Sequence, residues 1–165
     1  MMLNTNPRHQ DAGLAVRALT GHWGRLGMAL HFVARQEPFA SFRSADLVST
    51  LNAQILREHC LFALDGKRIV GYLGWAEYDA AVAQSFANGG AAPSNTLAHG
   101  KDVVWILTAA AVHDAALMAL VRTLRAEHPG MRVMGIRHKG QGRRVVFDRA
   151  ARGRAPALGL QRAAG

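Results

Sequence analysis

The first third of the chain has the apolar spacing of amphipathic helices. Between residues 11 and 35, apolar side chains recur every three or four positions and predict one helix, with its buried stripe formed by Val16, Leu19, Trp23, Leu26 and Leu30. Glycines weaken this segment and allow a break near Gly21. Pro38 ends the segment.

A second helix is expected to begin at Ser44, which can serve as its N-cap. Its buried face should consist of Leu47, Val48, Leu51 and Ile55. The polar face should point to water and includes Gln54. The pattern therefore places two helices before the first strand.

From Cys60 onward the pattern becomes that of β-strands. Two apolar runs, 60–64 and 69–78, flank the turn-forming pair Asp65-Gly66 and predict a β-hairpin. A short helix at 80–86 and a loop rich in Gly, Pro, Ser and Asn follow. The continuous apolar run 102–111 is typical of a central strand that is covered on both faces.

The last elements complete an alternating order. A helix is predicted at 113–127, and two strands are predicted at 131–138 and 143–149. A central strand that leads through a helix into another strand resembles the Gcn5-related acyltransferase architecture. We therefore expect an α/β (α+β) fold, with a mixed, mostly antiparallel sheet flanked by helices. At 165 residues the chain suits one core, so we expect a single acyltransferase-like domain at 1–150 and a basic, flexible tail at 151–165.

The net charge of +9 is concentrated near the end of the chain. From Met131 onward, Asp148 is the only acid beside nine basic residues: Arg132, Arg137, Lys139, Arg143, Arg144, Arg149, Arg152, Arg154 and Arg162. Such a concentration suits an acidic partner, although a solvated end without a partner is the alternative. Specific nucleic-acid binding is disfavoured because Phe147 is the only aromatic residue after residue 130 and no recognition motif is present.

Other totals narrow the protein class. No apolar run approaches the roughly 20 residues that span a bilayer, so no transmembrane segment is expected. The first residues lack the apolar stretch of a secretory signal, and the single cysteine, Cys60, excludes an internal disulfide. We expect a cytoplasmic protein with Cys60 buried. The eight histidines show no metal-ligand spacing, so no metal is expected.

One short motif matches a coenzyme A phosphate loop. Arg137-x-x-Gly140-x-Gly142 has the required spacing, but strand-like residues follow it where a helix N-terminus is needed, so a hairpin turn is favoured. The place where such a loop belongs, after the strand 102–107, reads TAAAVHDAAL and has no glycine. Coenzyme A is therefore not expected to bind in the usual manner.

Three segments that follow in the family's order resemble the toxin-activating lysine acyltransferases, within a resemblance that spans roughly Leu26 to Arg149. They are IVGYLGWA (69–76), GKDVVWILTAAAV (100–112) and HDAALMALVRTLRAEHPG (113–130). The resemblance implies transfer of a fatty acyl group from acyl carrier protein, rather than from coenzyme A, to lysines of a repeats-in-toxin (RTX) protein. No bound cofactor is then expected.

The usual catalytic pair of that family is replaced here. Phe39 takes the place of the family's catalytic His, and Leu107 lies where its Asp is expected. Neither side chain can transfer a proton or orient an imidazole. His113 and His31 remain as catalytic candidates, although each is also explained as a structural helix residue.

Two functional hypotheses follow, and whether the protein is an enzyme stays open between them. The first is a divergent lysine acyltransferase that docks acidic acyl carrier protein on Arg137, Lys139, Arg143 and Arg144. The second is a non-catalytic pseudo-acyltransferase. It would bind or regulate an acidic partner, an RTX-type protein or a second copy of itself as a homodimer.

Overall fold

The computed structural model describes residues 13–17, 19–90, 93, 98–139 and 143–149. These residues form a six-stranded sheet in which the strands neighbour one another in chain order. All neighbouring pairs are antiparallel except β4 and β5, which are parallel. The strands are β1 (Leu14–Arg17), β2 (Cys60–Asp65), β3 (Arg68–Tyr78), β4 (Val103–Ala111), β5 (Arg132–Lys139) and β6 (Arg143–Arg149). The expected mixed, mostly antiparallel α/β sheet is confirmed.

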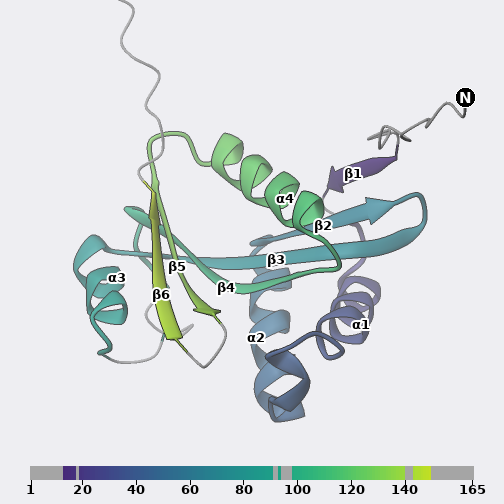
Figure 1. Ribbon diagram of the computed structural model, residues 1–165, viewed down its shortest axis with the longest axis horizontal. Coiled ribbons are helices and arrows are strands. Elements are labelled where there is room, and N and C mark those ends of the chain that lie inside the picture. The colour runs from purple at the N-terminus through teal and green to yellow at the C-terminus, as the bar shows by residue number, and fades with distance from the viewer. Residues whose placement is uncertain (1–12, 18, 91–92, 94–97, 140–142, 150–165) are drawn as a thin grey trace, which may run out of the picture.

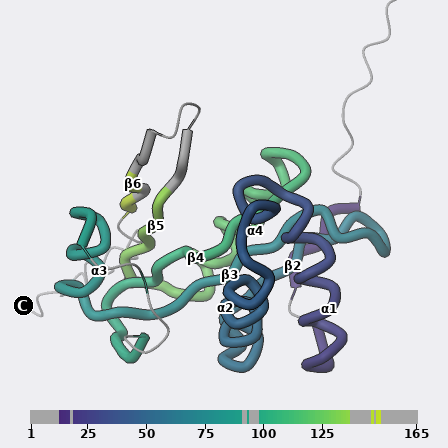
Figure 2. The backbone as a smooth tube through the Cα atoms, turned by 90° about the horizontal axis from the view of Figure 1, so that it is seen from below, coloured from purple at the N-terminus to yellow at the C-terminus, as the bar shows by residue number. Residues whose placement is uncertain are grey.

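Helices cover both faces of the sheet (Figure 1). Helix α4 lies on one face, and α1 and α2 lie on the other. Figure 2 shows α1 and α2 side by side over one end of the sheet, with α3 at the opposite end. The helices are α1 (His22–Val33), α2 (Ser44–Leu56), α3 (Ala80–Ala87) and α4 (Asp114–Glu127), with a 3-10 turn, η1 (Phe39–Ser41), between α1 and α2.

The N-terminal prediction of one helix over 11–35 is wrong. Residues 14–17 form β1, whose burial alternates along the strand and whose Val16 pairs with Ala63 of β2. A strand therefore precedes the two helices. Gly21, at φ 80°, separates β1 from α1, as the break near that residue predicted. The N-cap of α2 is Arg43 rather than Ser44, which is the first helical residue.

The core consists of three apolar clusters, one beneath each group of helices. Beneath α1 and α2, Leu26, Leu51 and Phe62 are among the residues that pack together. Beneath α4, Leu120 and Trp75 pack with residues of β2 to β5. Beneath α3, Phe86 packs on Trp105 with ring centroids 5.5 Å apart. The sheet is thus buried on both faces around β3 and β4, which explains their long apolar runs.

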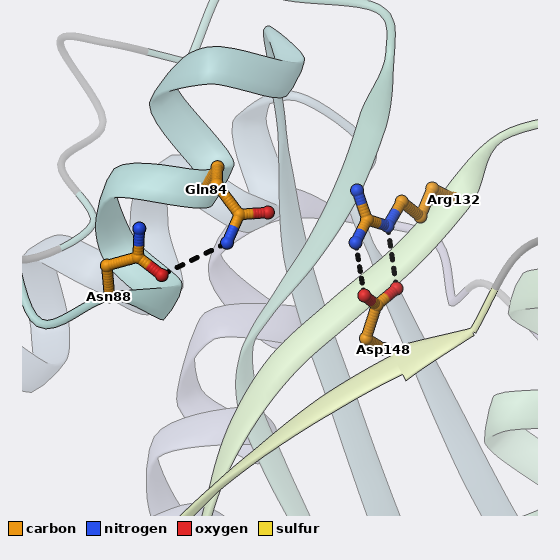
Figure 3. Close-up of polar contacts among 4 residues, drawn as sticks. All are labelled: Gln84, Asn88, Arg132 and Asp148. Atoms are coloured by element: carbon orange, nitrogen blue, oxygen red, sulfur yellow. Dashed lines mark hydrogen bonds and ion pairs between the residues drawn. The ribbon is translucent and has the colours of Figure 1, made fainter.

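The last two strands form the expected hairpin. Lys139 pairs with Arg143, and the main chain continues in antiparallel register to Val133 and Arg149. Arg132 and Asp148 add a two-point ion pair across the strands, and nearby Gln84 of α3 donates to Asn88, the C-cap of that helix (Figure 3). The glycines of the phosphate-loop motif and the predicted tail lie outside the described residues. No helix in the described part of the chain is long and apolar enough to cross a membrane.

Candidate functional site

Strands β4 and β5 separate halfway along their length. Their parallel pairing runs from Val103 with Arg132 to Ile106 with Gly135, and no described residue of β5 pairs with β4 beyond that point. Residues 108–111 continue along β3 alone. Among the described residues, the main chain of 107–111 therefore has no strand partner on the side toward β5, and such a free edge can pair with an extended ligand.

A bulge lies at the point of separation. On β3, Gly74 pairs with Thr108 but the next residue, Trp75, pairs with Ile106. Leu107 is therefore skipped by the register with β3. A bulge increases the local bend of its strand, so this bulge helps to turn the end of β4 away from β5.

An open pocket of about 250 Å³ lies at the carboxyl end of β4. Its wall comes from three places that are distant in sequence: the connection after α1, the end of β4 and the first turn of α4. The lining residues are Gln36, Glu37, Ala109, Ala110, Ala111, Val112, His113, Asp114 and Leu117. The pocket thus combines a small apolar floor with two carboxylates and one imidazole.

His113, one of the two catalytic candidates, lies in this pocket as the N-cap of α4. Its Nδ1 accepts a hydrogen bond from the Ala116 amide at 3.2 Å. While Nδ1 accepts, the proton of a neutral imidazole lies on Nε2, which can donate to a ligand. The prediction that His113 opens this helix is confirmed, and its place in the pocket leaves it available for chemistry.

The N-terminus of α4 does not form a phosphate cradle. The side chain of His113 occupies one of its amides, and Asp114 places a carboxylate in the first turn. Only Val112 and His113 connect β4 to α4, and neither is a glycine. An anion at this helix end would therefore meet a negative charge instead of a set of free amides.

The two positions that were expected to replace a catalytic pair, Phe39 and Leu107, are apolar in their surroundings as well as in identity. Phe39 is 9% exposed and belongs to the cluster beneath α1 and α2. Its ring packs edge-on against the ring of Phe42, with the two ring centroids 5.3 Å apart. Leu107 is partly buried against the cluster beneath α3. Neither position provides a polar group for proton transfer.

The other candidates behave differently from His113. His31 is exposed on α1 and does not line the pocket. Cys60 is buried as expected, and burial raises the pKa of its thiol to about 11, which leaves it a poor nucleophile. Within the described residues, no group of three or more His, Cys, Asp or Glu could hold a metal.

Sequence reasoning missed three polar residues of this region. Gln36 and Glu37 line the pocket, and nothing in their local pattern separates them from ordinary loop residues. Gln54, expected to face water, is only 1% exposed. Its long aliphatic stem and its place next to Ile55 on the buried side of α2 were the available signals.

The predicted docking residues lie in the β5–β6 hairpin. Arg137 and Lys139 belong to β5, and Arg143 and Arg144 belong to β6. The register pairs His138 with Arg144 and Lys139 with Arg143, so the four main-chain positions are close together. Their side chains lie outside the described part of the structure, so the docking role stays a prediction.

No protein-family model matches the chain, and no curated protein matches it. Among solved structures, the chain is similar to the GNAT-like decarboxylase GphF in complex with isobutyryl-CoA. The TM-score is 0.54 and the identity 19%, over 77% of this chain and 67% of that one. It is also similar to a histone acetyltransferase HPA2-related protein from Corynebacterium glutamicum ATCC 13032, with TM-score 0.47 and 19% identity over 77% of this chain and 78% of that one.

The likeness to GphF confirms a fold like that of the Gcn5-related N-acetyltransferases (GNAT-like). Neither structure is described as a toxin-activating lysine acyltransferase, so that finer resemblance stays a prediction. A shared fold also leaves the reaction open, since one fold hosts different chemistries.

Proposed function

We propose that the chain binds the phosphopantetheine thioester of an acyl carrier protein at the end of β4 and transfers its acyl group to a protein amine. The observation that carries this proposal is the free main-chain edge of residues 107–111 beside the pocket. The phosphopantetheine arm is extended and contains two amides, so it can hydrogen-bond to a strand edge much as a peptide does. GphF, which has this fold at TM-score 0.54, is described with a bound acyl thioester.

A carrier protein is favoured over free coenzyme A as the donor. Coenzyme A carries a pyrophosphate that needs free helix amides, whereas the start of α4 carries the His113 cap and Asp114. A carrier-linked arm ends in a single phosphodiester on an acidic protein. The chain's charge of +9 suits such a partner, with Arg137, Lys139, Arg143 and Arg144 as the proposed docking residues.

The proposed acceptor is a lysine of an RTX-type protein. The lysine and RTX assignment rests on the resemblance of residues 69–76 and 100–130 to toxin-activating acyltransferases. The pocket supports a cationic acceptor independently, because Glu37 and Asp114 both line it and can attract an ammonium group.

His113 is the residue that we propose for the chemical step. The deprotonated lysine nitrogen would bond to the thioester carbonyl carbon while the C–S bond breaks, and the nitrogen's proton would pass through water to the departing thiolate. The Nε2–H of His113 would donate to the carbonyl oxygen as negative charge develops there. Since Phe39 and Leu107 supply no base, we expect slow transfer that rises with pH as more lysine is deprotonated.

A non-catalytic role is the second candidate, and it is favoured by the surroundings of Phe39 and Leu107. Both side chains pack in apolar clusters, as expected for a relative that has kept its fold and lost its proton-transfer pair. Such a protein would bind the acylated carrier, or regulate it, without turnover.

One experiment separates the two candidates. The protein is co-expressed with acyl carrier protein and an RTX-type protein, and lysine peptides are weighed by mass spectrometry. If the protein is an acyltransferase, acylated lysines should be found, and their amount should decrease with His113→Ala. The amount should not change with His31→Ala, because His31 lies outside the pocket. Salt-sensitive binding of acylated carrier without acylated lysines supports the second candidate. Absence of both binding and adduct refutes both.

A further inference from the structure

A buried polar network links α2 to β3 and β4 on one face of the sheet, where β4 bulges. Gln54 of α2 donates from Nε2 to the Thr108 hydroxyl at 3.0 Å, and its Oε1 accepts from the Tyr72 hydroxyl at 2.8 Å. All three residues are at most 1% exposed. Burial raises the pKa of Tyr72 well above its usual range, so its hydroxyl remains protonated and can donate.

The absence of a side chain at Gly74 of β3 leaves space for the Gln54 amide. A Cβ atom at Gly74 would overlap the Gln54 carboxamide, so any other residue at position 74 would displace the amide from its two partners. Gly74 pairs across the sheet with Thr108, and the β3–β4 register shifts between Gly74 and Trp75. The amide therefore lies against the bulge itself, in contact with both strands that form it.

Packing alone does not account for this arrangement. The remaining buried face of α2 is apolar, and an apolar residue at position 54 would fill the space without needing partners. A buried amide is tolerated only when its polar atoms are paired. Here each of its two ends is paired to a different strand, which fixes the position of Thr108 relative to β3.

The position of Thr108 determines the pocket wall. Side chains alternate between the faces of a strand, so a shift of one residue would exchange the faces of Ala109, Ala110 and Ala111. It would also change which main-chain groups form the free edge. We infer that Gln54 is a positioning residue: its bonds to Tyr72 and Thr108 hold the bulge in register and so align the free edge of β4 for the thioester. This inference rests on the proposed function for its ligand.

The first test compares variants that do and do not leave unpaired groups. Gln54→Met leaves the buried hydroxyls of Tyr72 and Thr108 without hydrogen-bond partners and should lower stability. The triple variant Tyr72→Phe, Gln54→Met, Thr108→Val also removes both hydroxyls, so no polar group is left unpaired. It should recover most of the lost stability, because replacing all partners of a hydrogen bond by apolar groups is nearly neutral. A role in positioning predicts that the triple variant still binds an acyl-pantetheine analogue about tenfold more weakly than the wild type.

A second readout does not need the ligand. Amide hydrogen exchange at residues 108–111 should be about tenfold faster in the triple variant than in the wild type, while exchange in α4 is unchanged. Thr108→Ser keeps the hydroxyl and should retain the wild-type exchange and binding, whereas Thr108→Val should not. Wild-type exchange and affinity in the triple variant would overturn the inference. If the wild type itself fails to bind the analogue, the proposed function fails, and the exchange data alone decide the role of Gln54.

Discussion

Replacing Phe39 by alanine should destabilise the protein strongly, because its ring is part of the apolar core. The ring is 9% exposed and packs in the cluster beneath α1 and α2. Substitutions of buried Phe by Ala typically cost about 3–5 kcal/mol, which includes the cavity that they leave. Since η1 is a three-residue turn that can relax into part of the space, we expect a loss of about 3 kcal/mol.

Urea denaturation measures this loss directly, and a thermal melt should show a decrease of about 6–12 °C for a chain of this size. Phe42→Ala is the matched control, since Phe42 is 49% exposed and touches Phe39 from outside. It should cost about 1 kcal/mol or less. A loss below about 1 kcal/mol for Phe39→Ala would show that the ring is not part of the core. The prediction that an apolar side chain fills the place of a catalytic residue would then be refuted.

Three further predictions concern charged and reactive groups. Glu58→Ala should cost about 1–2 kcal/mol, because it removes the ion-pair partner of Arg25, whose side chain is only 9% exposed. Asp148→Ala should cost less than about 1 kcal/mol, because the side chains of its pair with Arg132 are more exposed. Urea midpoints compare the two variants, and equal losses would contradict the reasoning. The hydrogen bond from Arg25 lowers the pKa of Glu58 below its ordinary value of 4.5. The stability that this pair adds is therefore complete above pH 4.5 and is lost as the pH falls through the lowered pKa. Glu58→Ala should not show this loss when its stability is measured as a function of acid pH. Cys60, with a pKa of about 11, should have a thiolate fraction of about one in a thousand at pH 8. Because the thiol is also buried, mass spectrometry should find alkylation by iodoacetamide only after the protein is unfolded. Rapid labelling of the native protein would refute the burial of Cys60.

Periodicity predicted most elements of the fold because they are long and strongly patterned. The hairpin around Asp65-Gly66, the central strand and helix α4 follow directly from changes between two-residue and three-to-four-residue spacing. The four-residue strand β1 was missed because Val16 also fits a helical stripe. What decides its conformation is pairing with Ala63, a residue nearly fifty positions away, which local spacing does not contain.

The site was less predictable than the fold, since it depends on contacts between distant segments. The replacement of a catalytic pair at Phe39 and Leu107 could be proposed from aligned positions, and the structure surrounds both with apolar groups. The contribution of Glu37 to the pocket depends on how the connection after α1 crosses the end of β4. The position of Gln54 on the buried side of α2 was a signal for its burial, but the space for its amide depends on a glycine two elements later, which no helical pattern records.

The most direct test of the proposed thioester site is an amide chemical-shift titration of the ¹⁵N-labelled protein. The ligand is a non-hydrolysable acyl-pantetheine analogue. The account predicts that the largest shifts occur at residues 107–113, along the free edge of β4 and at the His113 cap. Saturable shifts confined to other elements, or no shifts at millimolar analogue, would contradict it.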